Sequence, residues 1–373
     1  MPKLRKSIYS AAVVSAFLSF ANAQTAGLPN RWGQVLDPPV PADRLELVTG
    51  AAQPSQDIDQ RAALIDLLTK ALQHSNVRRG PYDMHSSFTS FGSSSSDGTW
   101  ELQDTSPKSG AYRWSAEGPS FSVVNLYSNQ ILYSTQLAAS VPLRLAQVRS
   151  AIFFKETPLG PYATLRSASA SLEGASLTCV LVGHDGAKNL TGGRRWNEIE
   201  YCVDPTSNNL ITYSPVPGYY VLFDYSKALT FHNSLLPNKF TITQGGKTVI
   251  EAQIESITDP TESADAFQPS SGMASIGVGA LMTAAGNINF LVHSPGVNPS
   301  AREVVVVHGV QPPSGPMTDL EVISSTNTSL NSAALKFATE WKGGRTLPDS
   351  GQPGATRQTH EVYQTLHFLN MTQ

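Results

Sequence analysis

Hydrophobic positions recur with two different periods along the chain. Between Ile58 and His74 apolar side chains return every three or four residues, which places one apolar stripe on a helix. From Tyr82 to about residue 260 the period is two, in short runs separated by Gly, Asn and Pro turns. A helical stretch at residues 143–154 interrupts these runs. We therefore expect one long antiparallel sheet that curls into a half-barrel, with a helix covering its concave face.

The end of the chain has its own order of elements. Strand patterns at residues 302–310 and 318–325 precede a helical stripe that ends at Trp341, and a last strand runs from about 359 to 368. This order predicts a small ββαβ domain of two layers, so the fold class expected for the whole chain is α+β. The core predicted for this domain is Val305, Leu320, Val322, Leu330, Ala334, Phe337 and Trp341.

The N-terminus has the features of an export signal. Three basic residues, Lys3, Arg5 and Lys6, precede an apolar run and the small-residue motif Ala21-Asn22-Ala23. The apolar run is shorter than the roughly 20 residues of a spanning helix. We expect cleavage and a periplasmic location; the alternative is an uncleaved segment that anchors the chain in the inner membrane.

These patterns divide the chain into five parts. The predicted divisions are a signal peptide (1–23), an extended segment (24–57), a β-rich domain (58–262), a linker or flap (263–298) and the C-terminal domain (299–373).

Composition and charge limit the classes of partner that the protein is expected to bind. Of the 373 residues 40% are hydrophobic and 15% charged, and the net charge is −3. Cleavage would remove three basic residues and no acidic one, which takes the charge from −3 to −6. A mildly acidic protein of this kind is not suited to nucleic acid.

The two cysteines predict a structural disulfide. Cys179 and Cys202 both lie in strand-like runs. In an oxidising compartment the expected state is a bond between them. The alternative, a redox pair, usually has the close spacing CxxC, which is absent here.

No catalytic pattern occurs in the sequence. The eight histidines are scattered, and the chain has no HExxH, no nucleophile elbow and no glycine-rich phosphate or dinucleotide loop. We expect a protein that is not an enzyme and that has no catalytic residue, metal or cofactor.

Residues 299–369 resemble the C-terminal domain of the TonB family. The resemblance rests on the valine-rich strand 304–307, Gly315, Ser324-Ser325, Ala333-Ala334 and Trp341. It implies that a receptor segment of the outer membrane, as in TonB-dependent transport, adds a strand to the exposed edge of this domain. The edge residues it implies are Thr359, Glu361, Tyr363, Thr365 and His367. The alternative is that this domain only docks on the first one.

Residues 58–260 more weakly resemble the LolA-like periplasmic lipoprotein carriers. The resemblance rests on Gly98, Ser106-Pro107, Arg113-Trp114 and the run FSVVNLYSNQILYS. It implies a half-barrel whose concave face holds acyl chains, so the second expected function is a carrier of a hydrophobic ligand. The expected ligand-face residues are Tyr127, Leu132, Tyr213, Tyr219 and Phe223. The alternative is that these residues form an ordinary core.

Overall fold

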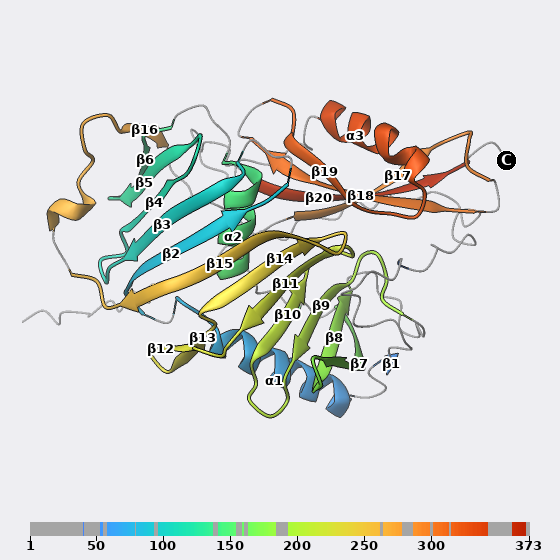
Figure 1. Ribbon diagram of the computed structural model, residues 1–373, viewed down its shortest axis with the longest axis horizontal. Helices are drawn as coiled ribbons and strands as arrows, with labels where there is room; N and C mark the ends of the chain where they lie inside the picture. Colours follow the sequence, from blue (N-terminus) through green and yellow to red (C-terminus); the bar gives the residue numbers. More distant parts are fainter. Residues whose placement is uncertain are drawn as a thin grey trace, which may run out of the picture.

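We analysed a computed structural model of the chain (Figure 1). The structure describes residues 40, 53–54, 58–78, 80–92, 96–136, 141–153, 159, 163–183, 193–261, 264–277, 286–298, 301–312, 315–341 and 360–370. The predicted signal peptide, nearly all of the extended segment and Thr359 lie outside these residues.

A sheet of 14 strands makes up most of the described chain. In spatial order its strands are β1 (Gln53–Pro54), β7 (Thr164–Leu172), β8 (Ala175–Gly183), β9 (Ile199–Val203), β10 (Leu210–Ser214), β11 (Tyr219–Asp224), β14 (Lys239–Gln244), β15 (Lys247–Thr258), β2 (Tyr82–Ser90), β3 (Gly98–Ser106), β4 (Tyr112–Glu117), β5 (Ser122–Ser128), β6 (Ile131–Ser134) and β16 (Ala274–Gly277). All neighbours in this sheet are antiparallel. A hairpin of β12 (Leu229–Phe231) and β13 (Ser234–Leu236) forms a separate small sheet.

Alternation along the strands gives the large sheet two different faces. On β2 and β3 the buried positions include Met84, Phe88, Trp100 and Leu102, which take part in the main hydrophobic core. We call the face that carries these residues the inner face, and the opposite one the outer face. The two faces explain why the sequence has a period of two over this region.

Two helices pack against the inner face (Figure 1). Helix α1 (Ile58–His74) contacts β7, β9 and β13, and buries Leu68, Ala71 and Leu72. Helix α2 (Leu143–Phe153) is buried along its whole length and contacts β15 on one side and β18 and β20 on the other. The structure thus confirms the two predicted helices within two residues of their expected ends.

The second sheet has four strands in the order β17-β20-β18-β19. These are β17 (Gly286–His293), β20 (His360–Leu369), β18 (Glu303–Gln311) and β19 (Thr318–Ser325). Helix α3 (Asn331–Glu340) follows a short 3₁₀ turn, η3 (Thr328–Leu330), and packs on one face of this sheet. Strand β17 pairs with β20 in parallel, and β18 is antiparallel to both of its neighbours.

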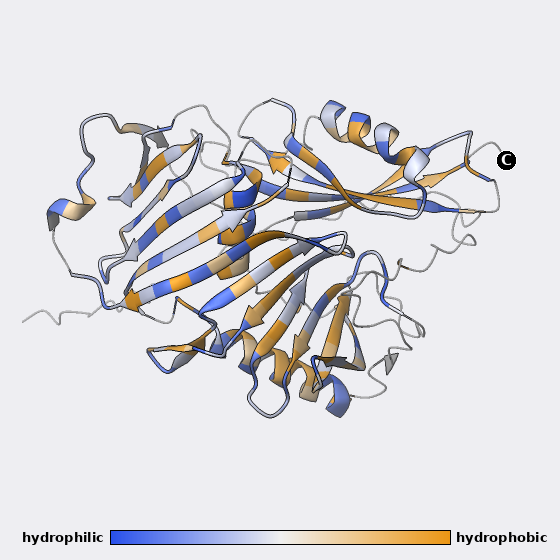
Figure 2. Ribbon diagram, viewed as in Figure 1, coloured by the Kyte–Doolittle hydropathy of each residue, from blue (hydrophilic) through white to orange (hydrophobic). Residues whose placement is uncertain are grey.

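The predicted core of the C-terminal part gathers between α3 and this sheet. Val305 and Ala334 are buried there, and Leu320, Val322, Leu330 and Phe337 pack against them while partly exposed. Trp341, directly after α3, contacts Phe290 of β17 with ring centroids 6.0 Å apart. Figure 2 shows the apolar residues that run along β18 and β20.

The predicted fold class was wrong in two respects. The protein is mostly β, and its large antiparallel sheet is open rather than curled into a half-barrel. The C-terminal sheet is not a separate ββαβ domain either, because β17 adds a fourth strand and because Val304, Val306 and Tyr363 belong to the same core as the large sheet. The predicted linker or flap contains η2 (Ala264–Phe267), β16 and β17, so one of its strands joins each sheet.

Candidate functional site on the inner face

All five predicted ligand-face residues lie on the inner face. The register of β9 to β15 places Tyr213 beside Val221, and Phe223 beside Phe240, which in turn pairs with Ala252. Leu132 and Tyr127 pair with each other on β6 and β5. The period-two pattern thus identified the correct face, but the structure does not bring the five side chains together at one place.

Two of these residues lie beneath the C-terminal sheet. The ring centroid of Tyr219 is 5.6 Å from that of His308 and 5.6 Å from that of Tyr363. Burial, and secondarily the Glu361 carboxylate, raises the pKa of both Tyr213 and Tyr219 well above the ordinary value. Both phenols are therefore neutral at physiological pH, and they form core contacts rather than an open surface.

Phe223 lines a small apolar cleft that reaches the surface. Ala151 and Ile152 of α2 form one wall, and strands of the inner face form another. The full lining is Ser75, Val77, Ala151, Ile152, Phe223, Leu236, Pro237, Phe240 and Ile254. The cavity volume is about 10 Å³. That is room for about one water molecule, so α2 fills nearly all of the inner face at this point.

A buried ion pair fixes α2 to one side of the inner face. The Arg149 guanidinium donates to both oxygens of Asp104 at 3.0 Å and to the Tyr112 hydroxyl at 2.7 Å. It also lies 3.9 Å above the ring of Trp114. Burial alone would lower the pKa of Arg149, but the Asp104 carboxylate keeps this pKa above its ordinary value. The guanidinium therefore remains charged, and its hydrogen bonds hold the helix to β3 and β4.

A second buried polar group joins α2 to the C-terminal sheet. We call it the interface cluster, and its members are Arg144, Gln147, Ser150, Gln244, His308 and Glu361. His308 Nε2 lies 2.8 Å from Glu361 Oε1, and Ser150 donates to the other oxygen of that carboxylate. His308 Nδ1 lies 3.3 Å from the Gln147 amide nitrogen and 3.1 Å from that of Gln244.

The cluster has a definite donor and acceptor order. Arg144 donates to the side-chain oxygens of Gln147 at 3.0 Å and Gln244 at 2.7 Å, which leaves both amide nitrogens to face His308. His308 Nδ1 then accepts, and Nε2 carries the proton that it donates to Glu361. Arg144 also forms an ion pair with Glu321 of β19 at 3.0 Å. The arrangement ties three strands of the C-terminal sheet to one buried helix.

A separate cavity of about 120 Å³ lies on the outer face, beside η2. Its lining is mainly polar, with Asp83, Gln103, Thr105 and Arg113 among it. Asp83 accepts from Thr105 at 2.8 Å and from Gln103 at 3.1 Å. Polar side chains of adjacent strands thus satisfy this carboxylate, as in many sheet surfaces.

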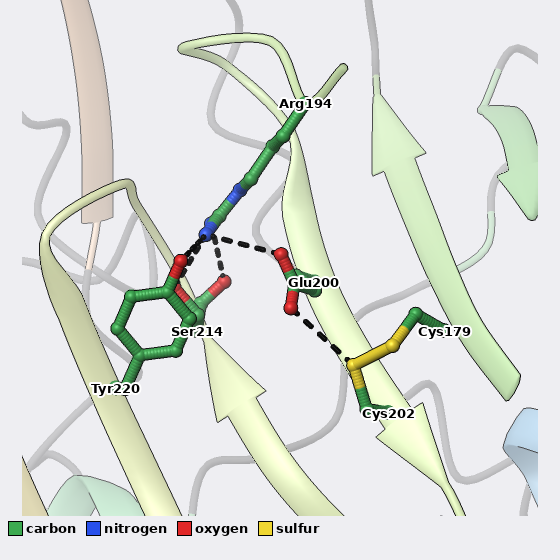
Figure 3. The surroundings of a disulfide bond; sticks show 6 residues. All are labelled: Cys179, Arg194, Glu200, Cys202, Ser214 and Tyr220. Carbon is green, nitrogen blue, oxygen red and sulfur yellow. Dashed lines mark hydrogen bonds and ion pairs between the residues drawn. A yellow bond between two sulfur atoms is a disulfide. The ribbon is translucent and has the colours of Figure 1, made fainter. Parts of the chain in front are cut away.

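The predicted disulfide is confirmed (Figure 3). The register of β8, β9 and β10 places it on the outer face. Cys179 and Cys202 are directly opposite each other on β8 and β9, with their Cα atoms 3.9 Å apart. The Glu200 carboxylate lies 3.3 Å from Cys202 Sγ and 3.5 Å from the Arg194 guanidinium. Both sulfurs are used in the bond, so this group of potential ligands offers no thiolate to a metal.

The predicted partner-binding edge was wrong. The strand that carries Glu361, Tyr363, Thr365 and His367 is the interior strand β20, which pairs with β17 on one side and β18 on the other. Its backbone groups are therefore already bonded within the chain, and these four side chains are buried. The TonB-like resemblance missed this because the residues of β17 had been assigned to the linker.

The sequence did not single out the residues that close the inner face. Arg144, Gln147 and Arg149 lie within LRLAQVRSAIF, which the sequence pattern identifies as a helix without assigning a role to its polar residues. Their signal was the presence of two arginines in a helical stretch whose other residues are mostly apolar. Among the described residues, no helix combines the length and apolar character that a membrane crossing requires.

Comparison with known proteins gives structural likenesses only. No family model and no curated protein matches the chain. A LolA superfamily protein from Nitrosomonas europaea is 9% identical with a TM-score of 0.37, covering 55% of this chain and 97% of its own. MucB in its complex with MucA from Pseudomonas aeruginosa is 13% identical with a TM-score of 0.25, covering 57% of this chain and 63% of its own. Because both TM-scores are below 0.5 and both identities below 25%, neither the LolA-like nor the TonB-like resemblance rests on these likenesses.

Proposed function

We propose that this protein is an exported binding protein that takes an apolar ligand of the acyl-chain class on the inner face of its large sheet. The observation that supports the proposal is the apolar cleft between α2 and the strands around Phe223. Ser75 is the one polar residue among the nine that line it. A cleft of this composition is suited to hydrocarbon, because each buried methylene contributes about 0.8 kcal/mol.

The cleft has to widen before it can hold a ligand. Its volume of about 10 Å³ is far below that of a typical ligand pocket, about 300–1,000 Å³. The wall formed by Ala151 and Ile152 belongs to the last turn of α2, whereas Phe223 and Phe240 belong to paired strands of the sheet. The proposal therefore assigns the opening to the C-terminal end of α2, whose displacement would expose more of the apolar inner face.

Two features support export to an oxidising compartment. The N-terminal pattern of basic, apolar and small residues is typical of a cleavable signal. The disulfide between Cys179 and Cys202 would persist outside the cytosol and is rare within it. A periplasmic location is accordingly part of the proposal.

The test is a binding titration with a fluorescent fatty acid. The protein is first unfolded and refolded to remove lipid acquired during expression, and its recovery is checked by circular dichroism. We expect saturable binding that Ala151→Phe weakens at least tenfold, because the larger side chain fills the cleft. Ala333→Phe makes the same change at an exposed position of α3 and should leave binding unchanged.

Two outcomes would count against the proposal. One is a refolded protein that binds no fatty acid at any accessible concentration. The other is equal binding by the unmodified protein and by Ala151→Phe with both folded, which would place the fatty acid outside the cleft.

A further inference from the structure

The polar cavity on the outer face contains two opposite charges that do not pair with each other. Its lining includes a row of residues across three strands, in which Asp83 of β2 pairs with Thr105 of β3 and Thr105 with Arg113 of β4. Two such steps place the Cα atoms of Asp83 and Arg113 about 10 Å apart, close enough for their charges to attract each other unless other contacts hold them. Among the described residues, however, no ion pair joins Arg113 to an acidic side chain, and Asp83 forms one only with His85, at 3.9 Å.

Each of the two charges is held by a neutral partner. Thr105 and Gln103 both donate to Asp83 Oδ1, at 2.8 and 3.1 Å, and so fix the carboxylate to β3. The Arg113 guanidinium donates to the Ala266 carbonyl of η2 at 3.5 Å. These bonds use one of the two carboxylate oxygens and one of the five N–H groups of the guanidinium. Both charged groups therefore keep hydrogen-bonding capacity for a ligand in the cavity.

The size and the walls of the cavity suit a small molecule. Its volume of about 120 Å³ is roughly ten times what one water molecule needs, and it is below that of a pocket for a drug-sized ligand. Ser115 adds a hydroxyl to the lining, and Phe267 of η2 adds an aromatic side chain that is buried. The cavity thus offers a negative acceptor, a positive donor and an apolar wall to the same ligand.

From this arrangement we propose that the outer-face cavity binds a small zwitterion of the amino-acid class, whose ammonium group donates to Asp83 and whose carboxylate accepts from Arg113. The charges of the lining sum to zero, so a ligand with one charge of each sign neutralises both. An anion alone would meet the Asp83 carboxylate, and a cation alone would meet the Arg113 guanidinium. The planar guanidinium is also well matched to a carboxylate. The site lies on the face opposite the apolar cleft, so this inference is independent of the ligand-binding proposal.

The first test is a calorimetric titration of the full chain with glycine, β-alanine and γ-aminobutyrate, which differ in the distance between their two charges. We expect at least one of them to bind saturably, and acetate and methylammonium, which carry one charge each, to bind at least tenfold more weakly. Asp83→Asn keeps an acceptor oxygen for Thr105 and Gln103 but removes the charge, and should weaken binding of the amino acid at least tenfold. Arg113→Gln should weaken it by a similar factor.

A second test assigns each charge of the ligand to its residue. N-acetylation removes the positive charge of the amino acid, and amidation of the carboxyl group removes the negative charge. We expect acetylation to weaken binding to the unmodified protein but to have no further effect on Asp83→Asn, because the partner of the ammonium group is already absent. Amidation should likewise have no further effect on Arg113→Gln. A general loss of structure would not produce this pattern.

Two exposed residues outside the cavity provide matched controls. Glu101→Gln and Lys108→Gln remove one negative and one positive charge, and both variants should bind the amino acid as the unmodified protein does. Three results would each overturn the proposal. These are no saturable binding of any of the three amino acids at millimolar concentrations, binding that survives both Asp83→Asn and Arg113→Gln, and a neutral sugar such as glucose that binds more tightly than all three.

Discussion

At the scale of single residues, the contact between Arg149 and Asp104 is one whose loss should lower stability strongly. Both side chains are at most 2% exposed, so water cannot replace either partner. Arg149→Met leaves the Asp104 carboxylate buried without its cation. We expect the free energy of unfolding to fall by about 3–5 kcal/mol, measured by urea denaturation followed by circular dichroism.

The control for this change is an exposed ion pair. Lys70 and Asp66 lie 2.6 Å apart on α1, with side chains 58% and 60% exposed. Lys70→Met should lower the free energy of unfolding by no more than about 0.5 kcal/mol. The double variant Asp104→Asn with Arg149→Met should recover part of the loss, because no buried charge remains. A loss below 1 kcal/mol for Arg149→Met alone would show that α2 does not depend on this pair.

At this scale, the sequence predicts those features that depend on the local alternation of apolar and polar residues. It placed Tyr213, Tyr219 and Phe223 on the inner face, because a period of two fixes the face of every residue in a strand. It paired the two cysteines because the chain has only these two and carries the pattern of an export signal. It could not find the partner of Arg149, since Asp104 lies 45 residues away and only the packing of α2 brings them together.

At the scale of elements, the turn between β10 and β11 should control how closely the two sheets approach. Gly218 has a φ of +86°, and a Cβ there would lie 2.4 Å from the Ile323 carbonyl oxygen of β19. Gly218→Ala therefore forces β19 to move, in addition to the strain of a positive φ. We expect it to lower the free energy of unfolding by clearly more than the 1–2 kcal/mol that such strain costs, measured by urea denaturation.

Gly246 provides a matched control in the next turn, between β14 and β15. Its φ is +76°, and a Cβ there would meet nothing within 4 Å. Gly246→Ala thus includes the strain but not the clash, and should cost only about 1–2 kcal/mol. Equal losses for the two variants would mean that the contact between the turn and β19 contributes nothing.

Helices and most antiparallel strands could be predicted, but β17 could not. Residues 58–74 and 143–153 carry a helical period, and hairpin-linked strands show a period of two followed by a turn. The segment GNINFLVH has no regular alternation, and it pairs in parallel with residues more than 70 positions later. That pairing depends on the closure of a long loop that no local pattern encodes. The wrong position of the partner-binding edge follows from this single omission.

At the scale of the whole molecule, the two sheets share a core that the predicted division into domains separated. Val304, Val306 and Tyr363 pack in one cluster with Trp114 and Tyr219 of the large sheet. The interface cluster joins α2 to β18 and β20 by buried hydrogen bonds, and Arg144 joins it to β19 by an ion pair with Glu321. The sequence implied independent units because each half has its own sequence of elements. Because residues of the two halves that are far apart in the sequence are buried in one core, the two halves form one unit.

We therefore expect the large sheet and the C-terminal sheet to unfold in a single transition. Fluorine-labelled tryptophan gives a separate nuclear magnetic resonance signal for each site, with Trp100 and Trp114 reporting the large sheet and Trp341 the end of α3. In a urea series the three folded signals should lose intensity at the same midpoint, because removing either sheet exposes the apolar core of the other. Glu361→Ala leaves His308 and Ser150 without their buried acceptor, and should shift all three midpoints down together. An earlier midpoint for Trp341 alone, in either protein, would show that the C-terminal sheet is an independent domain after all.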